Sequence, residues 1–319
     1  MALVGGTDTS KEVPLTFREA WDHEDPTERK LWREAIRKEF HDMIRRGVWR
    51  DFKTSQVPKD RRLIGCKWVF RIKNDGRHRA RLCALGYTQI AGIDHQDNFA
   101  PVINDVTFRV IMTLLVSNNW EADIVDIETA FLYGELEEEI YIKVPEGLET
   151  YLDTMFGPDH CFLLNKAMYG LVQAARQFYK KFIKIMTKEL GFEKCLADSC
   201  LLRRTNGNGT VLVCVYVDDT MCVGDRKAID ELKKQLEQHF SIKDEGSMEE
   251  YVGCTVTRGN QGTLTMRQPH LLRKIEKEFG EEMDQVRAYS TPAGTRETIM
   301  KIKEKDNDLI GLEPSKQTR

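Results

Sequence analysis

The sequence predicts an α+β fold with a partly antiparallel sheet, because strand and helix patterns interleave along the chain without an internal repeat. The clearest strand pattern is residues 211–224, VLVCVYVDDTMCVG, where two apolar runs flank the adjacent carboxylates Asp218 and Asp219. Apolar runs that meet at a polar pair predict a β-hairpin with both carboxylates at its tip. A strand with acidic residues is predicted over residues 120–127, and amphipathic helices are predicted between the strands.

The composition is typical of a soluble globular protein. The 319 residues carry a net charge of −3, and 31% of them are charged. Because no apolar run approaches the length of a membrane span, we expect no membrane partner. The eight cysteines form no C-x-x-C pair, so the sequence predicts neither a zinc site nor a disulfide framework.

The predicted helices have recognisable start and stop residues. Asp25, Pro26 and Glu28 provide an N-cap, a first-turn proline and a capping-box carboxylate for a helix that stops at Gly47. Asp225 is the predicted N-cap of a later helix. Other helices are predicted over residues 105–118, through residues 178–190 and over residues 269–279, and short strands over residues 141–144, 251–257 and 263–266.

Residues 62–85 predict a second hairpin, whose turn is Asn74-Asp75-Gly76. Residues 59–81 hold nine Lys or Arg against two Asp, a local excess of seven positive charges. Such a run is usually only a solvated face. On a two-stranded arm, alternating with aromatic residues, it also suits contacts with nucleic-acid phosphates.

Three carboxylates carry the chemical interpretation. Asp218 and Asp219 can simply make a turn, since Asp favours turns. They can also be two ligands of a two-metal phosphoryl-transfer site, which needs a third carboxylate from elsewhere in the chain. Asp126, at the end of the strand predicted over residues 120–127, is the candidate, and its alternative role is that of a solvent-facing residue at a strand end.

Three stretches in order, IVDIETAFLYGEL, LNKAMYGLVQAARQFY and VYVDDTMCVG, resemble the reverse transcriptase of Ty1/copia-type LTR retrotransposons. IGCKWVFRIKNDGRHRARLCALGYTQIAGID extends the resemblance, which covers roughly residues 17–292. It implies the right-hand polymerase fold of fingers, palm and thumb, with an antiparallel palm sheet. The implied division is a flexible lead (1–16), fingers with the N-terminal helix and basic hairpin (17–119), palm with the first Asp motif (120–134), a fingers and palm continuation (135–168), palm with the nucleotide-pocket helix and YVDD hairpin (169–224), a thumb-like region (225–292) and a linker toward an RNase H domain that the chain lacks (293–319).

The resemblance also implies roles for individual residues. Asp126, Asp218 and Asp219 match the catalytic metal ligands, joined by the backbone carbonyl of Ile127; they would hold two Mg²⁺ ions, for which Mn²⁺ can substitute. Phe131 matches the aromatic residue beneath the sugar, which excludes a 2′-hydroxyl, although an isolated Phe is more often a core residue. The other implied nucleotide-binding residues are Lys73, Arg79, Arg81, Thr129, Ala130, Tyr169, Gly170 and Gln173, and the implied primer and template contacts are Arg77, Tyr216 and Val217.

The implied function is that of an RNA-directed DNA polymerase, which extends a primer on an RNA or DNA template with dNTPs during retrotransposon replication. We expect it in the cytoplasm, in the virus-like particle of the element, or in the nucleus, with RNase H and integrase domains in the parent polyprotein. The chain departs from the family at Leu85 and Val172, where Lys is usual, and at Ala175, where Pro is usual. Two alternatives are a decayed copy that only binds nucleic acid and a polymerase that prefers DNA templates.

Overall fold

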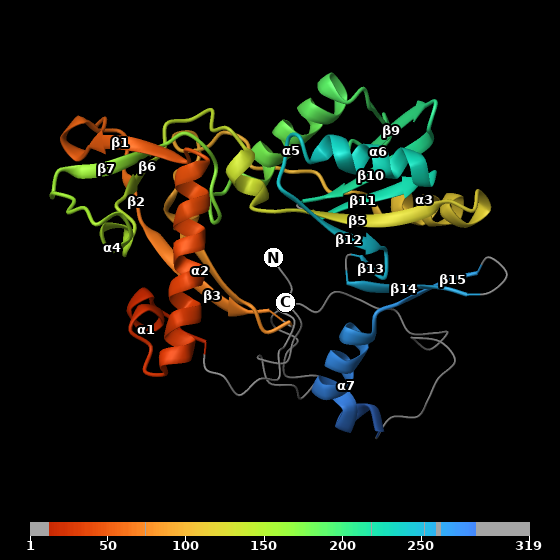
Figure 1. Cartoon of the computed structure of the whole chain (residues 1–319), viewed down its shortest axis with the longest axis horizontal. Helices are drawn as coiled ribbons and strands as arrows, with labels where there is room; N and C mark the ends of the chain where they lie inside the picture. Colours follow the sequence, from red (N-terminus) through yellow and green to blue (C-terminus); the bar gives the residue numbers. More distant parts are fainter. Residues whose placement is uncertain (1–12, 74, 218, 252, 260–262, 285–319) are drawn as a thin grey trace, which may run out of the picture. The chain divides into compact units, whose positions relative to one another are not determined.

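The structure, a computed structural model, describes residues 13–284 except 74, 218, 252 and 260–262 (Figure 1). The chain divides into two compact units, residues 1–268 and 269–319. In the second unit the described element is α7 (Pro269–Asp284), which begins at the predicted proline and runs past residue 279. The predicted lead (1–16) lies mostly, and the predicted linker (293–319) entirely, outside the described residues.

An antiparallel six-stranded sheet is the centre of the first unit, with the strand order β12-β5-β11-β10-β9-β8. Its strands are β5 (Glu121–Ile127), β8 (Glu193–Lys194), β9 (Leu201–Asn206), β10 (Gly209–Tyr216), β11 (Asp219–Gly224) and β12 (Ile242–Ser247). Strands β10 and β11 form the predicted hairpin, with pairs from Val211↔Gly224 to Tyr216↔Asp219. The α+β prediction is therefore confirmed at the level of helix and strand content.

Three helices pack with this sheet in one apolar core. They are α3 (Asp105–Ser117), α5 (Ala174–Lys184, extended by a π-helical turn over Ile185–Glu189) and α6 (Arg226–Leu236). Phe108, Phe178 and Leu232, one from each helix, are buried in it. Since α6 and β12 belong to this core, a thumb-like region that starts at residue 225 would divide a continuously packed body.

A second apolar core joins three helices, a hairpin and a four-stranded sheet. In Figure 1 these elements lie on the opposite side from the six-stranded sheet. The helices are α1 (Phe17–Trp21), α2 (Pro26–Arg45) and α4 (Leu148–Leu152). The hairpin is β3 (Cys66–Ile72) with β4 (His78–Ala84), and the sheet is β1 (Trp49–Lys53), β7 (His160–Leu164), β6 (Tyr141–Lys143) and β2 (Leu63–Ile64). The predicted helix and basic hairpin are both confirmed.

Two predicted helix caps differ in detail. The Asp25 carboxylate accepts hydrogen bonds from the backbone N–H of Thr27 (2.7 Å) and Glu28 (3.2 Å), as predicted. Glu28 makes no capping box: its carboxylate lies 2.6 Å from the His78 ring, because β4 packs against this helix. Asp225 precedes α6 as predicted, but its carboxylate accepts from the Thr210 N–H (2.7 Å) on the neighbouring strand and caps nothing in α6.

A small antiparallel sheet follows the six-stranded one: β13 (Glu250–Tyr251), β14 (Cys254–Arg258) and β15 (Leu264–Arg267). The strand predicted over residues 263–266 is confirmed as β15, whereas the stretch predicted as one strand over residues 251–257 is divided between β13 and β14. Among the helices that the structure describes, none is long and apolar enough to cross a bilayer.

Candidate active site

The candidate site begins at the end of strand β5. In the sheet register Asp126 lies opposite Asp219 of β11 on one side and opposite Lys243 of β12 on the other. Directly opposed residues of antiparallel strands project from the same face of the sheet. Two of the three predicted carboxylates are therefore neighbours on one face, and Asp218, the third, lies outside the described residues.

This arrangement suits a divalent cation. Like charges placed directly opposite each other destabilise a sheet, and a cation bound between them would offset that cost. Lys243, the residue opposite Asp126 on β12, is itself paired with Glu245 (2.5 Å). Carboxylate oxygens are the ligands that Mg²⁺ prefers. Within the described part of the chain, no three His, Cys, Asp or Glu side chains are grouped to hold a metal, so a site of three carboxylates depends on Asp218.

The backbone is strained on both sides of these carboxylates. Val217, immediately before Asp218, has φ 56°, and Thr129, three residues after Asp126, has φ 54°. A β-branched residue rarely adopts the left-handed region, and the cost is of order 1–3 kcal/mol. Such strain persists where the surrounding structure imposes it, which occurs most often at functional sites.

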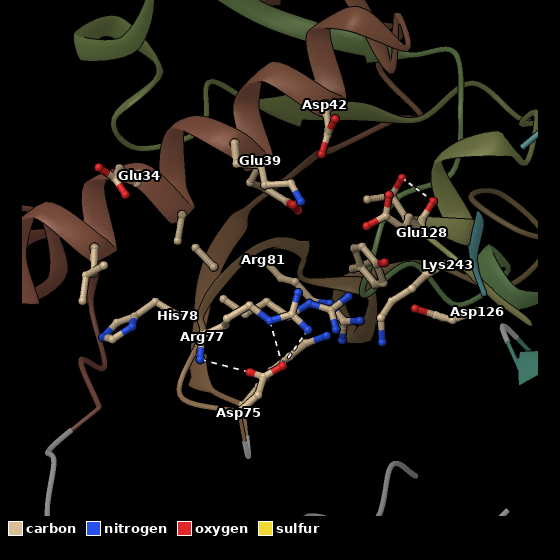
Figure 2. Close-up of a pocket in the computed structure, with 18 of the residues that line it drawn as sticks. Glu34, Glu39, Asp42, Asp75, Arg77, His78, Arg81, Asp126, Glu128 and Lys243 are labelled. Carbon is tan, nitrogen blue, oxygen red and sulfur yellow. Dashed lines mark hydrogen bonds and ion pairs between the residues drawn. The ribbon is translucent and has the colours of Figure 1, made fainter. Parts of the chain in front are cut away.

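A cavity of about 600 Å³ extends from Asp126 to the basic hairpin and α2 (Figure 2). Figure 2 shows acidic side chains of α2 along one edge of the cavity, Asp126 and Lys243 at another, and Arg77 and Arg81 between them. Eight residues with predicted site roles line it: Lys73, Arg77, Arg79, Arg81, Asp126, Ile127, Thr129 and Tyr169. The structure thus brings the basic arm and the first Asp motif to the same cavity.

The cavity is rich in positive charge near the hairpin turn. Arg77 is neutralised by Asp75 (2.6 Å), and this hydrogen-bonded pair lowers the pKa of the Asp75 carboxyl to about 2. Burial lowers the pKa of Lys73, and the neighbouring Arg79 and Arg77 lower it further. The Arg81 guanidinium stacks on the Tyr169 ring, 4.3 Å from its centre.

Four predicted nucleotide-binding residues are not among those that line the cavity: Ala130, Phe131, Gly170 and Gln173. Phe131, half-buried in the short 3₁₀ turn Ala130–Tyr133, packs against Tyr169 with the ring centres 5.0 Å apart. Gly170 has φ 87°, and a Cβ there would lie 2.1 Å from the Ala84 carbonyl oxygen. Glycine therefore allows the base of β4 to approach, and the Ala84 N–H donates to the Tyr169 carbonyl (2.7 Å).

Gln173 is fully buried, and its amide is engaged by the segment that follows the hairpin. It donates to the Asp94 carbonyl (2.9 Å) and accepts from the Gln89 amide (3.0 Å). Tyr216 and Val217, the predicted primer contacts, are half-buried at the end of β10 and outside this cavity. The nucleotide and primer roles of these residues stay predictions.

Comparison with known proteins places this architecture in a family. Residues 49–294 match the family model described as reverse transcriptase (RNA-dependent DNA polymerase). The chain belongs to this family.

The curated relatives of this reverse transcriptase confirm its resemblance to Ty1/copia-type elements. The chain is 34% identical over 288 residues to a retrovirus-related Pol polyprotein from transposon TNT 1-94 of Nicotiana tabacum, covering 88% of this chain and 21% of the relative. It is 32% identical to the polyprotein of transposon RE2 of Arabidopsis thaliana (72% and 16% covered) and 29% identical to the transposon Ty1-ER2 Gag-Pol polyprotein of Saccharomyces cerevisiae (74% and 13%). The chain therefore spans about a fifth or less of these relatives.

Among solved structures, a foamy virus protease-reverse transcriptase matches with a TM-score of 0.39 and 16% identity, over 74% of this chain and 27% of that one. The fold described above therefore rests on the helices and strands of this chain and not on that structure.

Sequence patterns missed the contribution of α2 and of β12 to the cavity. Lys38, Glu39, Arg45 and Arg46 line it from α2 and its C-terminal end, and Lys243 lines it from β12. Glu39 did carry a signal, because it falls on the same face as Ile36, Phe40 and Met43 and is a carboxylate on an apolar face. For Lys243 the sequence holds no comparable signal, since only the register with β5 brings it beside Asp126.

Proposed function

We propose that the chain is an RNA-directed DNA polymerase that extends a primer with deoxynucleotides taken from dNTPs. The observation that carries this proposal is the register pairing of Asp219 with Asp126, which lines one end of a cavity whose other wall is the basic hairpin. Carboxylates at one end and arginines at the other suit a substrate that reacts at one phosphate and is held by the rest of its triphosphate. Membership of the reverse transcriptase family supports the same function.

In this proposal the six-stranded sheet with its helices is the palm, and α1, α2 and the β3–β4 hairpin belong to the fingers. The separate apolar cores of these two parts support the division. The thumb-like region would follow the palm sheet. Because α6 and β12 share the palm core, we place them with the palm and begin the thumb after β12.

Asp126, Asp218 and Asp219, with the Ile127 carbonyl, would hold two Mg²⁺ ions, or Mn²⁺ in their place. When bound, such ions lower the pKa of the attacking hydroxyl and neutralise the charge that develops on the leaving phosphates. Lys73, Arg79 and Arg81 would bind the triphosphate. Phe131 would limit the space beneath the sugar, and Tyr169, which packs against Phe131 and carries Arg81 over its own ring, would hold the Phe131 ring in place.

The partners follow from this activity: a primer, an RNA or DNA template and dNTPs. By analogy with the relatives, which are Pol or Gag-Pol polyproteins, the parent protein would carry further domains, RNase H and integrase among them. The protein would act in the cytoplasm, within the virus-like particle of the element, or in the nucleus.

Primer extension with purified protein, on RNA and on DNA templates with Mg²⁺, tests the proposal. Asp126→Asn and Asp218→Asn should each reduce extension by several orders of magnitude. Asp105→Asn, the same substitution at an exposed residue of α3, should leave extension at the wild-type level. If the wild type extends neither template but binds both, the chain is a nucleic-acid-binding module; if Asp126→Asn extends normally, the site assignment is wrong.

A further inference from the structure

The cavity contains an arginine for which neither the sequence patterns nor the family match accounts. Arg46 follows α2, three residues before the matched segment begins at residue 49, and it lines the same cavity as Arg81 and Asp126. Its guanidinium carbon lies 4.1 Å from the centre of the Tyr133 ring, and its Nη2 donates to Ser241 Oγ at 3.4 Å. Its Nε is buried and has no hydrogen-bond partner among the described residues.

Arg81 repeats this arrangement on the hairpin wall. It stacks on a tyrosine, Tyr169, at 4.3 Å, and its buried Nε likewise finds no partner in the part of the chain that the structure describes. A guanidinium stacked on a ring is fixed in orientation, and its planar fork matches phosphate oxygens. Two oriented guanidinium groups that line one cavity suit an anion with several oxygens.

The charge balance of the cavity points the same way. Of its five arginines, Arg45 and Arg77 have carboxylate partners, at 3.3 Å from Asp42 and 2.6 Å from Asp75. Arg46, Arg79 and Arg81 form no ion pair with any described residue, but the charges of Arg79 and Arg81 act on the buried Glu39 carboxyl. For Arg46, a partly buried cation without a counter-charge is costly, and a bound anion would remove that cost.

The place of Arg46 relative to Asp126 follows from the sheet. Its anchor Ser241 accepts a hydrogen bond through its carbonyl from the Glu128 N–H (2.9 Å), and Lys243, two residues after Ser241, is the register partner of Asp126. With strands about 4.8 Å apart and a rise of about 3.3 Å per residue, Ser241 lies on the order of 8 Å from Asp126 along the backbone plane. A short chain of linked phosphates can span that distance.

We propose that Arg46 is a phosphate-binding residue that holds a diphosphate group in the cavity, beside the reacting phosphate. This inference rests on the proposed polymerase function. The diphosphate group has two sources, the β- and γ-phosphates of a bound dNTP and the inorganic pyrophosphate that the reaction releases. In both cases α2 is part of the nucleotide site and not only a support for the hairpin.

Binding of inorganic pyrophosphate and of a non-hydrolysable dNTP analogue, measured by calorimetry on the full chain with Mg²⁺, tests the proposal without requiring turnover. Arg46→Ala should weaken binding of at least one of them tenfold or more, and Arg46→Lys should restore part of the loss. Arg37→Ala removes an exposed arginine of the same helix that does not line the cavity; it is the matched control and should bind both as the wild type does. Weakened binding of the analogue alone assigns Arg46 to the incoming nucleotide. Weakened binding of both ligands assigns Arg46 to the diphosphate group, whichever of the two sources supplies it.

A second variant and kinetic measurements distinguish phosphate binding by Arg46 from a purely structural role. Ser241→Ala removes the anchor of the guanidinium but keeps its charge, so it should weaken pyrophosphate binding less than Arg46→Ala. In primer extension, Arg46→Ala should raise the KM for dNTP more than it lowers kcat, and it should reduce inhibition by pyrophosphate. The proposal is overturned if Arg46→Ala folds, has a lower Tm and still binds both ligands normally. If the wild type binds pyrophosphate through Arg46 but extends no primer, the polymerase function fails while the anion site stands.

Discussion

Glu39 is the residue of α2 whose environment departs furthest from that of an ordinary surface carboxylate. It is 6% exposed, and its Oε1 accepts a hydrogen bond from the Leu82 N–H of β4 at 3.2 Å. Burial raises the pKa of Glu39 from 4.5 to about 7; Arg81 and Arg79 oppose this rise, and Asp42 adds to it. Glu39 therefore joins α2 to the strand that carries Arg79 and Arg81, and burial brings its pKa to about 7.

Glu39→Gln should change how stability depends on pH. Between about pH 4.5 and pH 7 the folded chain keeps a proton on Glu39 that the unfolded chain has lost, so the free energy of unfolding falls as pH rises through this window. The full effect is about 3 kcal/mol. Gln cannot ionise but can still accept from Leu82, so its urea-unfolding curves at pH 5 and pH 7.5 should differ less than those of the wild type. An equal difference in both proteins would contradict the burial argument.

Phe131→Ala should allow the enzyme to incorporate ribonucleotides. Phe131 is half-buried against Tyr169, so packing would hold its ring in place against a 2′-hydroxyl. We expect the ratio of kcat/KM for dNTP over rNTP to fall at least tenfold in primer extension with matched nucleotides. Phe156→Ala, which removes another half-buried aromatic ring remote from the cavity, is the control for general loosening. Unchanged sugar selectivity in Phe131→Ala would remove Phe131 from the site.

At the scale of elements, one carboxylate fastens α6 to the strand that ends in Asp126. Asp123 of β5 is 2% exposed and accepts from both Arg226 amino groups (3.1 and 2.5 Å) and from Lys233. Lys233 also pairs with Asp244 of β12 (2.7 Å), so a single network joins α6, β5 and β12. Burial opposes ionisation of Asp123, yet the hydrogen bonds from Arg226 and Lys233 keep its pKa below the usual range.

Asp123→Ala should therefore destabilise the fold much more than loss of an exposed charge. It leaves Lys233, whose side chain is 12% exposed, and Arg226 without their buried partner, and breaking a buried pair in this way costs about 3 kcal/mol. Asp244→Ala removes an acid whose side chain is 50% exposed, from the same network, and should cost less than about 1 kcal/mol. Urea unfolding of both variants measures the difference. Equal losses would show that Asp123 contributes no more than a surface charge.

The elements predicted from the sequence are those whose own residues specify them. Helix α2 has its cap, its proline and its buried Trp32 and Phe40, and the β10–β11 hairpin has two apolar runs around a polar pair. Strand β12 (IKDEGS) was missed because its residues are mostly charged and exposed; it is a strand because β5 offers it a free edge. The same limit applies to the site. Asp126 is recognisable from its motif, whereas Lys243 and Arg46 reach the cavity only through tertiary packing.

At the scale of the whole molecule, the net charge is negative, whereas the charge at the hairpin is positive. The chain is slightly acidic, with a net charge of −3, so attraction of a nucleic acid has to come from a local surface. The hairpin supplies that surface at the cavity, through Lys73, Arg77, Arg79 and Arg81. Four of the nine basic residues of the run therefore line the cavity, and their contact with phosphates stays a prediction.

Neutralising this surface should reduce the salt dependence of primer–template binding. Each phosphate contact contributes about −0.9 to the slope of log K against log salt concentration, so Arg77→Ala, Arg79→Ala and Arg81→Ala together should make the slope shallower by up to about 3. Arg77 should contribute least, because Asp75 already neutralises it at 2.6 Å. The control is the triple alanine variant of Arg18, Arg109 and Arg203, which are exposed residues outside the cavity and should leave the slope unchanged. Fluorescence anisotropy from 50 to 300 mM salt measures the slopes, and equal slopes for the two triple variants would mean that the hairpin arginines face solvent and not phosphate.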